Sequence, residues 1–361
     1  MANQPATTFR IARAGPASLA AAALGALVLA ILAALPAFAG RELIQNLIFV
    51  FDMLALAQCW NLLAGQAGLI SVGQQAFVGL GGYLLFALTI MAGLDPLLAI
   101  PLAGGVCAAL AFPAALIVFR LRGAYFAIGT WVVAEVCRLV LAQVKQLGGG
   151  TGTSLPPAVT SGVIGIEGIK TLFDVRTPAA RDILSYWVAL ALMAASFALV
   201  YAIQRSRRGL ALGAIRDSEA AAASLGVDIA SVKLSVYVAT AAMTGMIGAL
   251  IYLQKARISP DAAFSVLDWT AYVIFIVVIG GIGTIEGPIV GTLVFTLMQH
   301  YLADFGAAYL ILLGTLGILI MLFAPRGIWG FVVERYDFTL FPTRRRLFVE
   351  QRREGENRRI P

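Results

Sequence analysis

The feature that most constrains this chain is a succession of apolar windows, each long enough to cross a bilayer as a helix. Such a span needs about 20 mostly apolar residues. Only 12% of the 361 residues are charged and 60% are hydrophobic, whereas a soluble domain has about 25% charged residues. We therefore predict an all-α, polytopic integral membrane protein with about ten transmembrane helices, near 17–39, 43–63, 68–92, 96–119, 124–146, 183–204, 233–254, 268–284, 286–303 and 308–324.

The first window could be either a signal peptide or a membrane span. It follows two basic residues, Arg10 and Arg13, and Ala37-Phe38-Ala39 resembles a small-residue cleavage site. However, the apolar run is nearer a full span than the 7–15-residue core that is usual in signal peptides. We expect a retained first span.

The basic residues of the loops predict the orientation, because Lys and Arg near span ends concentrate on the cytoplasmic side. We expect a permease domain at 1–330 with both termini cytoplasmic, an extracytoplasmic loop at 147–182 and a cytoplasmic loop at 205–230. Lys255 and Arg257 fall outside and are the exception. The basic residues that fall inside are Arg120, Arg122, Arg205, Arg207, Arg208, Arg326 and Arg344–Arg346.

The two longest polar segments outside the spans have different expected roles. The C-terminal segment 331–361 is predicted to be a basic cytoplasmic tail that lies against anionic membrane lipid. Together with the loop arginines, it explains the net charge of +7 better than nucleic-acid binding does. The Pro- and Gly-rich segment Gly148–Arg181 could carry a surface helix or hairpin that meets an extracytoplasmic partner, or it could be a passive linker.

A polar run in the middle of the chain, Arg205–Asp228, interrupts the apolar windows. Good helix formers predict one short helix over Leu212–Leu225, which ends at Gly226 as the residue after the C-cap. A short helix between two membrane spans has little to do unless it touches a soluble partner, so we interpret it as the docking element for a motor protein. The residues we assign to this contact are Arg216, Asp217, Ser218, Glu219, Leu225 and Gly226.

A glycine-rich stretch, Asn61–Tyr83, is the first candidate for a translocation path. Its glycines let the backbone bend and let neighbouring helices approach closely. Its polar side chains lie in an apolar setting and need partners or a wet cavity. The stretch is thus either a broken helix that lines a path or a tightly packed helix with bonded amides. The candidate path residues are Asn61, Ser71, Gln74, Gln75, Phe77, Tyr125, Thr130, Gly283 and Thr284.

A second glycine-rich stretch, Gly280–Gly291, partly resembles a dinucleotide fingerprint, but it lacks the final Gly and lies between membrane spans. Gly283, Gly287 and Gly291 are four apart, as in a stripe where helices cross closely. Pro288 marks a helix break. The two glycine-rich spans lie five spans apart, which is compatible with an inverted repeat.

Glu135, Arg138 and Asp52 are charged side chains that lie well inside predicted spans, away from the span ends. Glu135 and Arg138 are three apart on one helix face and can pair with each other. Asp52 has no partner nearby in the sequence. These groups could be structural, or they could couple transport to an ion in a secondary transporter. A scaffold subunit without a transport role is a third class.

Several signatures of catalysis and ligand binding are absent from the sequence. No Lys follows a Gly, which excludes a Walker A loop, and neither HExxH nor GxSxG occurs. Cys59, Cys107 and Cys137 lie in apolar segments without CxxC spacing. We therefore expect no enzyme activity, no cofactor and no metal, and any ATP would bind to another chain.

Five collinear motifs resemble the permease subunits of branched-chain amino acid ABC importers of the LivM type. The resemblance extends from about Asn61 to Gly330. The motifs are NLLAGQAGLISVGQQAFVGLGGY, RLRGAYFAIGT, RSRRGLALGAIRDSEAAAASLGVD, VIGGIGTIEGPIVGT and LFAPRGIWG.

The resemblance implies a type II ABC importer permease in a bacterial inner membrane. Its partners would be a second homologous permease, two ATPase subunits and an extracytoplasmic solute-binding protein, with the coupling helix at Arg216, Asp217 and Glu219. The solute would be a branched-chain or other neutral amino acid. Urea or a small organic acid is the alternative, because relatives commonly have His at the position of Gln74 and a Gly-Gly-Ser-x-Gly-Leu run at Gly149–Thr153.

Overall fold

The computed structural model describes residues 7–12, 16–302, 305–324, 326–336 and 346–351. Lipid offers no partners to backbone N–H and C=O groups, so helices that pair these groups internally are the expected spanning elements. The all-α, polytopic fold class is confirmed. Within the described ranges, seven helical stretches are long and apolar enough to span a membrane: Arg41–Gln66, Pro96–Val118, Ala124–Leu141, Thr177–Arg205, Ile229–Lys255, Pro260–Gly280 and Leu310–Arg335.

The predicted count of ten spans is not confirmed. Helices α3 (Gln74–Ile90) and α14 (Gly287–Leu302) have 17 and 16 residues and are shorter than a full span. Each begins after a stretch of non-helical backbone that contains glycines with positive φ, which shortens the helix. In the first window, the apolar helix formed by described side chains covers Ala23–Ala37.

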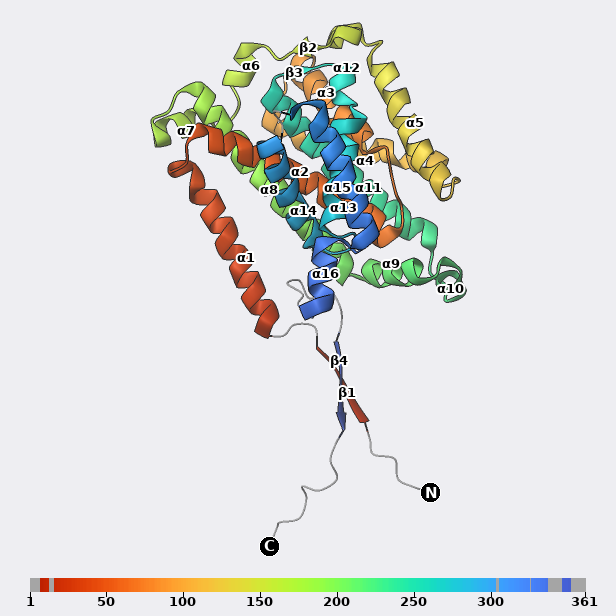
Figure 1. Cartoon of the computed structure of the whole chain (residues 1–361). Helices are drawn as coiled ribbons and strands as arrows, with labels where there is room; N and C mark the ends of the chain where they lie inside the picture. Colours follow the sequence, from red (N-terminus) through yellow and green to blue (C-terminus); the bar gives the residue numbers. More distant parts are fainter. Residues whose placement is uncertain (1–6, 13–15, 303–304, 325, 337–345, 352–361) are drawn as a thin grey trace, which may run out of the picture.

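The remaining helices and strands follow the apolar windows and the loops between them (Figure 1). Their bounds are α1 (Pro16–Ala34), α2 (Arg41–Asn61) continued by the π-helical turn η2 (Leu62–Gln66), α4 (Pro96–Val118), α5 (Ala124–Leu141), α6 (Pro157–Ser161), α7 (Ile166–Phe173), α8 (Thr177–Arg205), α9 (Arg207–Asp217), α10 (Glu219–Ser224), α11 (Ile229–Lys255), α12 (Pro260–Ala263), the π-helical turn η5 (Leu267–Ala271), α13 (Tyr272–Gly280), α15 (Ala307–Phe323) and α16 (Gly327–Tyr336). The 3-10 turns are Leu35–Ala37, Lys145–Leu147 and Gly149–Thr151, and the strands are β1 (Thr7–Ala12), β2 (Thr153–Ser154), β3 (Arg257–Ile258) and β4 (Arg346–Gln351).

Helix α11 packs closely against α3 and α4 in the core of the bundle. Glycine makes the close approach to α3 possible. A Cβ at Gly81 would lie 2.0 Å from the Gly245 carbonyl oxygen, and one at Gly248 would lie 2.2 Å from the Val78 carbonyl oxygen. Such contacts are tighter than any side chain tolerates, so these glycines fix the distance between the two helices.

The second glycine-rich stretch is not one continuous stripe. Gly283 lies in the turn before α14, with φ of +82°, so the prediction that it shares a helical face with Gly287 and Gly291 is wrong. The helix starts only at Gly287 because Pro288 in its first turn lacks the N–H that a longer helix would need. Gly291 does pack closely, since a Cβ there would lie 1.8 Å from the Ile276 carbonyl oxygen.

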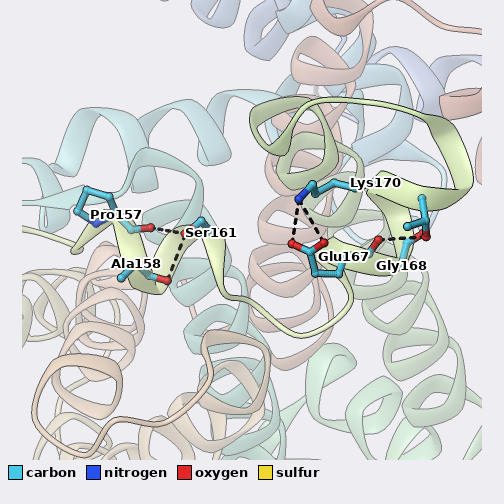
Figure 2. Close-up of polar contacts among 7 residues, drawn as sticks. Pro157, Ala158, Ser161, Glu167, Gly168 and Lys170 are labelled. Carbon is cyan, nitrogen blue, oxygen red and sulfur yellow. Dashed lines mark hydrogen bonds and ion pairs between the residues drawn. The ribbon is translucent and has the colours of Figure 1, made fainter.

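The long polar segment after α5 contains the two short helices α6 and α7. In α6, the Ser161 hydroxyl donates to the Pro157 carbonyl at 2.8 Å; in α7, Lys170 pairs with Glu167 at 2.9 Å (Figure 2). Helix α8 begins at Thr177, six residues before the predicted span, because Pro178 favours a helical first turn. Strand β2 pairs antiparallel with β3.

The two ends of the bundle carry different elements (Figure 1). One end, hereafter the α9 end, bears α9, α10 and α16, and the antiparallel pair β1–β4 projects from it. The opposite end, the α7 end, bears α6, α7 and the β2–β3 pair. The predicted boundary at residue 330 falls inside α16, while Arg344 and Arg345 of the predicted tail lie outside the described residues.

Candidate functional site: a loop between membrane helices, two helix breaks and a small cavity

The segment between α8 and α11 forms two helices rather than the single predicted helix over Leu212–Leu225. Ser218 separates them with an extended backbone, φ of −163° and ψ of 114°. Its hydroxyl accepts from the Ala221 N–H at 3.3 Å, which is the N-cap role that Ser favours. The single-helix prediction was wrong because it relied on the high helix propensity of this segment. It did not take into account that Ser218 can cap a second helix. Gly226 has φ of +83° directly after the C-cap of α10, as predicted.

Helix α9 has one buried and one exposed face. Leu212 and Ile215 are buried, and Leu212 belongs to the same apolar cluster as Leu62 and Leu63 of η2. Arg216 and Asp217, in contrast, are accessible. The buried face of α9 therefore packs against η2, at the end of α2.

Helix α10 presents a polar side and an exposed apolar end. Leu225, at its C-terminus, is 81% exposed, although it lies in a polar loop. The Glu219 carboxylate pairs with Lys233 of α11. Of the six residues predicted to contact a motor protein, Arg216, Asp217 and Leu225 are thus available to a partner. Ser218 caps α10, and Gly226 forms the turn after it. Glu219 links α10 to α11 through its ion pair with Lys233.

Asn61 joins the two glycine-rich stretches. Its Oδ1 accepts from the Gly283 N–H and its Nδ2 donates to the Thr284 carbonyl, both at 2.7 Å. Glycine is needed at the contact, because a Cβ at Gly65 would lie 2.5 Å from the Gly283 nitrogen. The structure therefore brings the predicted path residue Asn61 to two others, Gly283 and Thr284, that lie more than 200 positions later in the sequence.

Two glutamines complete this junction and were missed from the sequence. Gln58 Nε2 donates to the Ile285 carbonyl at 2.6 Å, and Gln66 Nε2 donates to the Gly283 carbonyl at 2.7 Å. Gln58 lies just before the predicted stretch Asn61–Tyr83 and Gln66 lies within it, so a polar side chain in an apolar setting could have indicated both. Their partners are backbone carbonyls of a non-helical turn, which residue types alone do not indicate. Hereafter we call Gln58, Asn61, Gln66 and the turn 283–285 the break junction.

A small cavity lies beside the break that precedes α3. Its volume is about 10 Å³, which is room for roughly one water molecule. Gln74 donates through Nε2 to the Leu56 carbonyl at 3.0 Å, but its Oε1 is buried and has no hydrogen-bond partner among the described residues. The residues that line the cavity are Cys59, Trp60, Leu63, Ser71, Gln74, Phe77, Tyr237, Thr240, Ala241 and Thr244.

The predicted residues Ser71, Gln74 and Phe77 all line this cavity, together with residues from α11. The Trp60 indole N–H donates to the Ser71 carbonyl at 2.8 Å, which holds the end of α2 against the break. Tyr237, Thr240 and Thr244 were missed because α11 reads as an ordinary apolar span. Their spacing places them on one helical face, but their position beside Gln74 depends on the tertiary packing of α11 against α3.

The remaining predicted path residues occupy other places. The Gln75 Oε1 accepts from the Thr270 hydroxyl of η5. The Thr130 hydroxyl accepts from the Val72 N–H at 3.0 Å, which fixes the break against α5. Tyr125 is 74% exposed at the start of α5, so the structure does not bring it to the cavity or to the break junction.

The ionisable residues of the spans are partnered. Arg138 pairs with Glu135, as predicted, and also with Asp261 of α12 at 2.7 Å. Asp52 is buried and accepts from Gln254 Nε2 at 3.4 Å. The described residues hold no group of three or more His, Cys, Asp or Glu side chains that could bind a metal ion.

Membrane-spanning helices, two helix breaks joined by polar side chains and a short helical pair between spans define a polytopic membrane permease. The chain belongs to the family described as the branched-chain amino acid transport system / permease component, whose model matches residues 42–324.

Curated relatives agree with this assignment. The chain is 31% identical over 281 residues to the high-affinity branched-chain amino acid transport system permease protein LivM of Salmonella typhimurium, an alignment that covers 74% of this chain and 65% of that protein. It is 30% identical over 298 residues to LivM of Escherichia coli, which covers 79% and 69%. It is 32% identical over 139 residues to BraD of Pseudomonas aeruginosa, which covers 37% and 43%. The matched region thus spans about two thirds of the length of either LivM protein. No solved structure matches the chain significantly.

Proposed function

We propose that this chain is a permease subunit of an ATP-binding-cassette importer that moves branched-chain or other neutral amino acids. The observation that carries the proposal is the α9–α10 pair. It lies between membrane spans in a chain of this permease family, it carries exposed charged and apolar side chains, and the sequence has no Walker A loop. Such a surface suits contact with a separate ATPase.

The proposed assembly follows the same logic. Two ATPase subunits would bind at the α9 end, which would face the cytoplasm of a bacterium, with both chain termini on that side of its inner membrane. An extracytoplasmic binding protein would deliver solute at the α7 end, and a second homologous permease would complete the path. The tail would lie against anionic lipid. Arginines at the α9 end support this orientation.

Within this chain, we assign the moving parts to the break junction and the Gln74 cavity. Breaks in spanning helices are tolerated where protein or water satisfies the freed backbone groups, and here Gln58, Asn61 and Gln66 do so. Leu212 of α9 shares an apolar cluster with η2. A displacement of α9 would therefore be transmitted to η2 through packed apolar side chains.

The test is uptake of labelled L-leucine by proteoliposomes that hold the chain with its co-purified partners. ATP inside the vesicles should drive uptake, and a protonophore should leave it intact. Uptake that survives ATP removal but collapses with the protonophore would instead establish an ion-coupled transporter. Excess unlabelled urea or a small carboxylate should not compete; competition by either would assign the alternative solute class.

A pair of variants locates the ATPase contact. Arg216→Ala should lower ATP-driven uptake because Arg216 is exposed on α9, whereas Arg122→Ala, in the loop between α4 and α5, should not. If both variants showed equal uptake and equal recovery of the ATPase subunits, the α9–α10 pair would not be the contact with the ATPase.

A further inference from the structure

Glu219 and Lys233 form an ion pair between the short helix α10 and the membrane helix α11. The Lys233 side chain is only 14% exposed, while that of Glu219 is 59% exposed. The carboxylate therefore reaches from the accessible side of α10 to an ammonium group largely enclosed at the base of α11. The pair spans the turn Leu225–Asp228, in which Gly226 reverses the chain.

Lys233 begins a stripe of side chains that leads along α11 to the cavity. Tyr237, Thr240 and Thr244 follow it at intervals of four, three and four residues, so all four lie within about 60° on one helical face. The last three line the Gln74 cavity. The face of α11 that meets α10 at the α9 end is thus the face that lines the Gln74 cavity, from about 6 to 17 Å further along the helix.

This face of α11 packs closely against α3 and the end of α4. Tyr237 packs edge-on against Phe77 of α3, with ring centroids 5.7 Å apart, and against Phe119 beyond the end of α4, at 5.5 Å. Gly248 sits against the α3 backbone. Close packing leaves α11 little freedom to bend, so a displacement at its base moves the cavity wall as a unit.

We propose that the Glu219–Lys233 pair is a positioning contact that carries movement of α10 into the cavity-lining face of α11. The inference rests on the proposed function, because it assigns the route by which a motor acting on α10 would reach the path. It adds a polar contact to the apolar one through Leu212 of α9, whose cluster includes both Leu62 of η2 and Tyr237 of α11. Glu219 acts through Lys233 and does not itself touch solute.

The experiment compares Glu219→Gln, Lys233→Met and the charge-swapped double variant Glu219→Lys/Lys233→Glu in the assembled transporter. ATP hydrolysis and L-leucine uptake are measured together. Each single variant should lower leucine moved per ATP hydrolysed by about two- to fivefold, the effect of a partly exposed ion pair. The swapped variant should regain most of the ratio. Glu334→Gln is the matched control, since it breaks the exposed pair with Arg326 at the same end of the bundle.

A second readout does not depend on the solute. In a background of Cys107→Ser and Cys137→Ser, the buried Cys59 reports on the cavity that it lines. ATP with vanadate should change its labelling by a maleimide. This change should be lost in Glu219→Gln and return in the swapped variant.

The outcomes separate the two proposals. If both single variants keep the parent's uptake-to-hydrolysis ratio and its labelling change, or if the swap restores neither after they fall, the pair has no positioning role while the importer assignment stands. If uptake in the parent needs no ATP, the importer assignment itself fails. If a single variant fails to assemble and the swap restores assembly but not the uptake-to-hydrolysis ratio, the pair is structural and its positioning role is overturned.

Discussion

Asn61 and Gly283 hold the two glycine-rich breaks together, since the Asn61 Oδ1 accepts from the Gly283 N–H at 2.7 Å. The same amide donates to the Thr284 carbonyl, so one side chain satisfies a donor and an acceptor in a turn with no helical partners. In an environment with little water, such groups cannot be left unpaired without cost. The relationship makes Asn61 the clearest target for mutation.

We expect Asn61→Leu to destabilise the protein. The change leaves the Gly283 N–H and the Thr284 carbonyl without their partner, at a cost of about 1–3 kcal/mol for each buried group that stays unpaired. The thermal unfolding midpoint in detergent should fall, and uptake should fall with it. Thr315→Val is the control, because its hydroxyl bonds only within its own exposed helix. A midpoint equal to that of the parent would show that the turn finds other partners.

Gly65→Ala should be destabilising although it adds only one methyl group. The new Cβ would lie 2.5 Å from the Gly283 nitrogen and 2.6 Å from its Cα, which are backbone atoms that cannot turn away. Overpacking of this kind costs about 1–3 kcal/mol. Unfolding of purified protein by heat measures it.

The matched control is Gly105→Ala on α4, where a Cβ meets nothing within 4 Å. Alanine is the better helix former by up to about 1 kcal/mol, so this variant should equal or exceed the parent in stability. If Gly65→Ala and Gly105→Ala behaved alike, the close approach of the two breaks would not be a feature of the folded protein.

Much of this fold follows from the sequence, because apolar windows and helical spans obey the same length requirement. The windows locate the long apolar helices α1, α2, α3, α4, α5, α8, α11, α13, α14 and α15. The Gly226 stop and the Glu135–Arg138 pair are local features that spacing reveals. Three kinds of feature could not be predicted from the sequence. The break at Ser218 depends on a cap that competes with strong helix formers. The shortened α3 and α14 depend on where backbone turns begin. The partners of Asn61 depend on tertiary packing.

The candidate site shows the same division. Ser71, Gln74 and Phe77 were predicted from one local stretch, and in the structure they line the same cavity. Tyr237, Thr240 and Thr244 complete its wall. Their spacing places them on one face of α11, but it does not indicate which helix that face meets. Tyr125 illustrates the opposite error: a motif residue near the path in sequence is exposed at the start of α5.

Gln74→Leu should separate stability from transport. Leucine removes the Gln74 Oε1, a buried acceptor without a partner among the described residues, but it also removes the hydrogen bond from Nε2 to the Leu56 carbonyl. The gain from the first change largely offsets the loss from the second. We expect the unfolding midpoint to stay within a few degrees of the parent or to rise, while L-leucine uptake drops. If stability fell together with uptake, Gln74 would be a packing residue. If uptake stayed at the level of the parent, the cavity would not be part of the translocation path.

Asp228 gives the protein a pH-dependent helix cap. It precedes α11, where its carboxylate accepts from the Ser231 N–H at 3.1 Å and the Ser231 hydroxyl at 2.6 Å. These donors hold its pKa below the ordinary value of 3.8. A carboxyl group whose pKa is lowered by folding stabilises the folded state above its unfolded pKa, and this contribution disappears as the pH falls through the folded pKa.

Ser231→Ala should therefore lower the unfolding midpoint at pH 7, and the difference from the parent should shrink as the pH is taken below 3.8. Loss of the hydroxyl removes the strongest of the donors that favour the charged carboxylate. Ser235→Ala, one turn further along α11, is the control, because the Ser235 hydroxyl bonds only to the Val232 carbonyl of the same helix. Its effect should not depend on pH. A Ser231→Ala deficit that stayed constant from pH 7 to pH 3 would mean that the hydroxyl supports the helix without acting through the charge of Asp228.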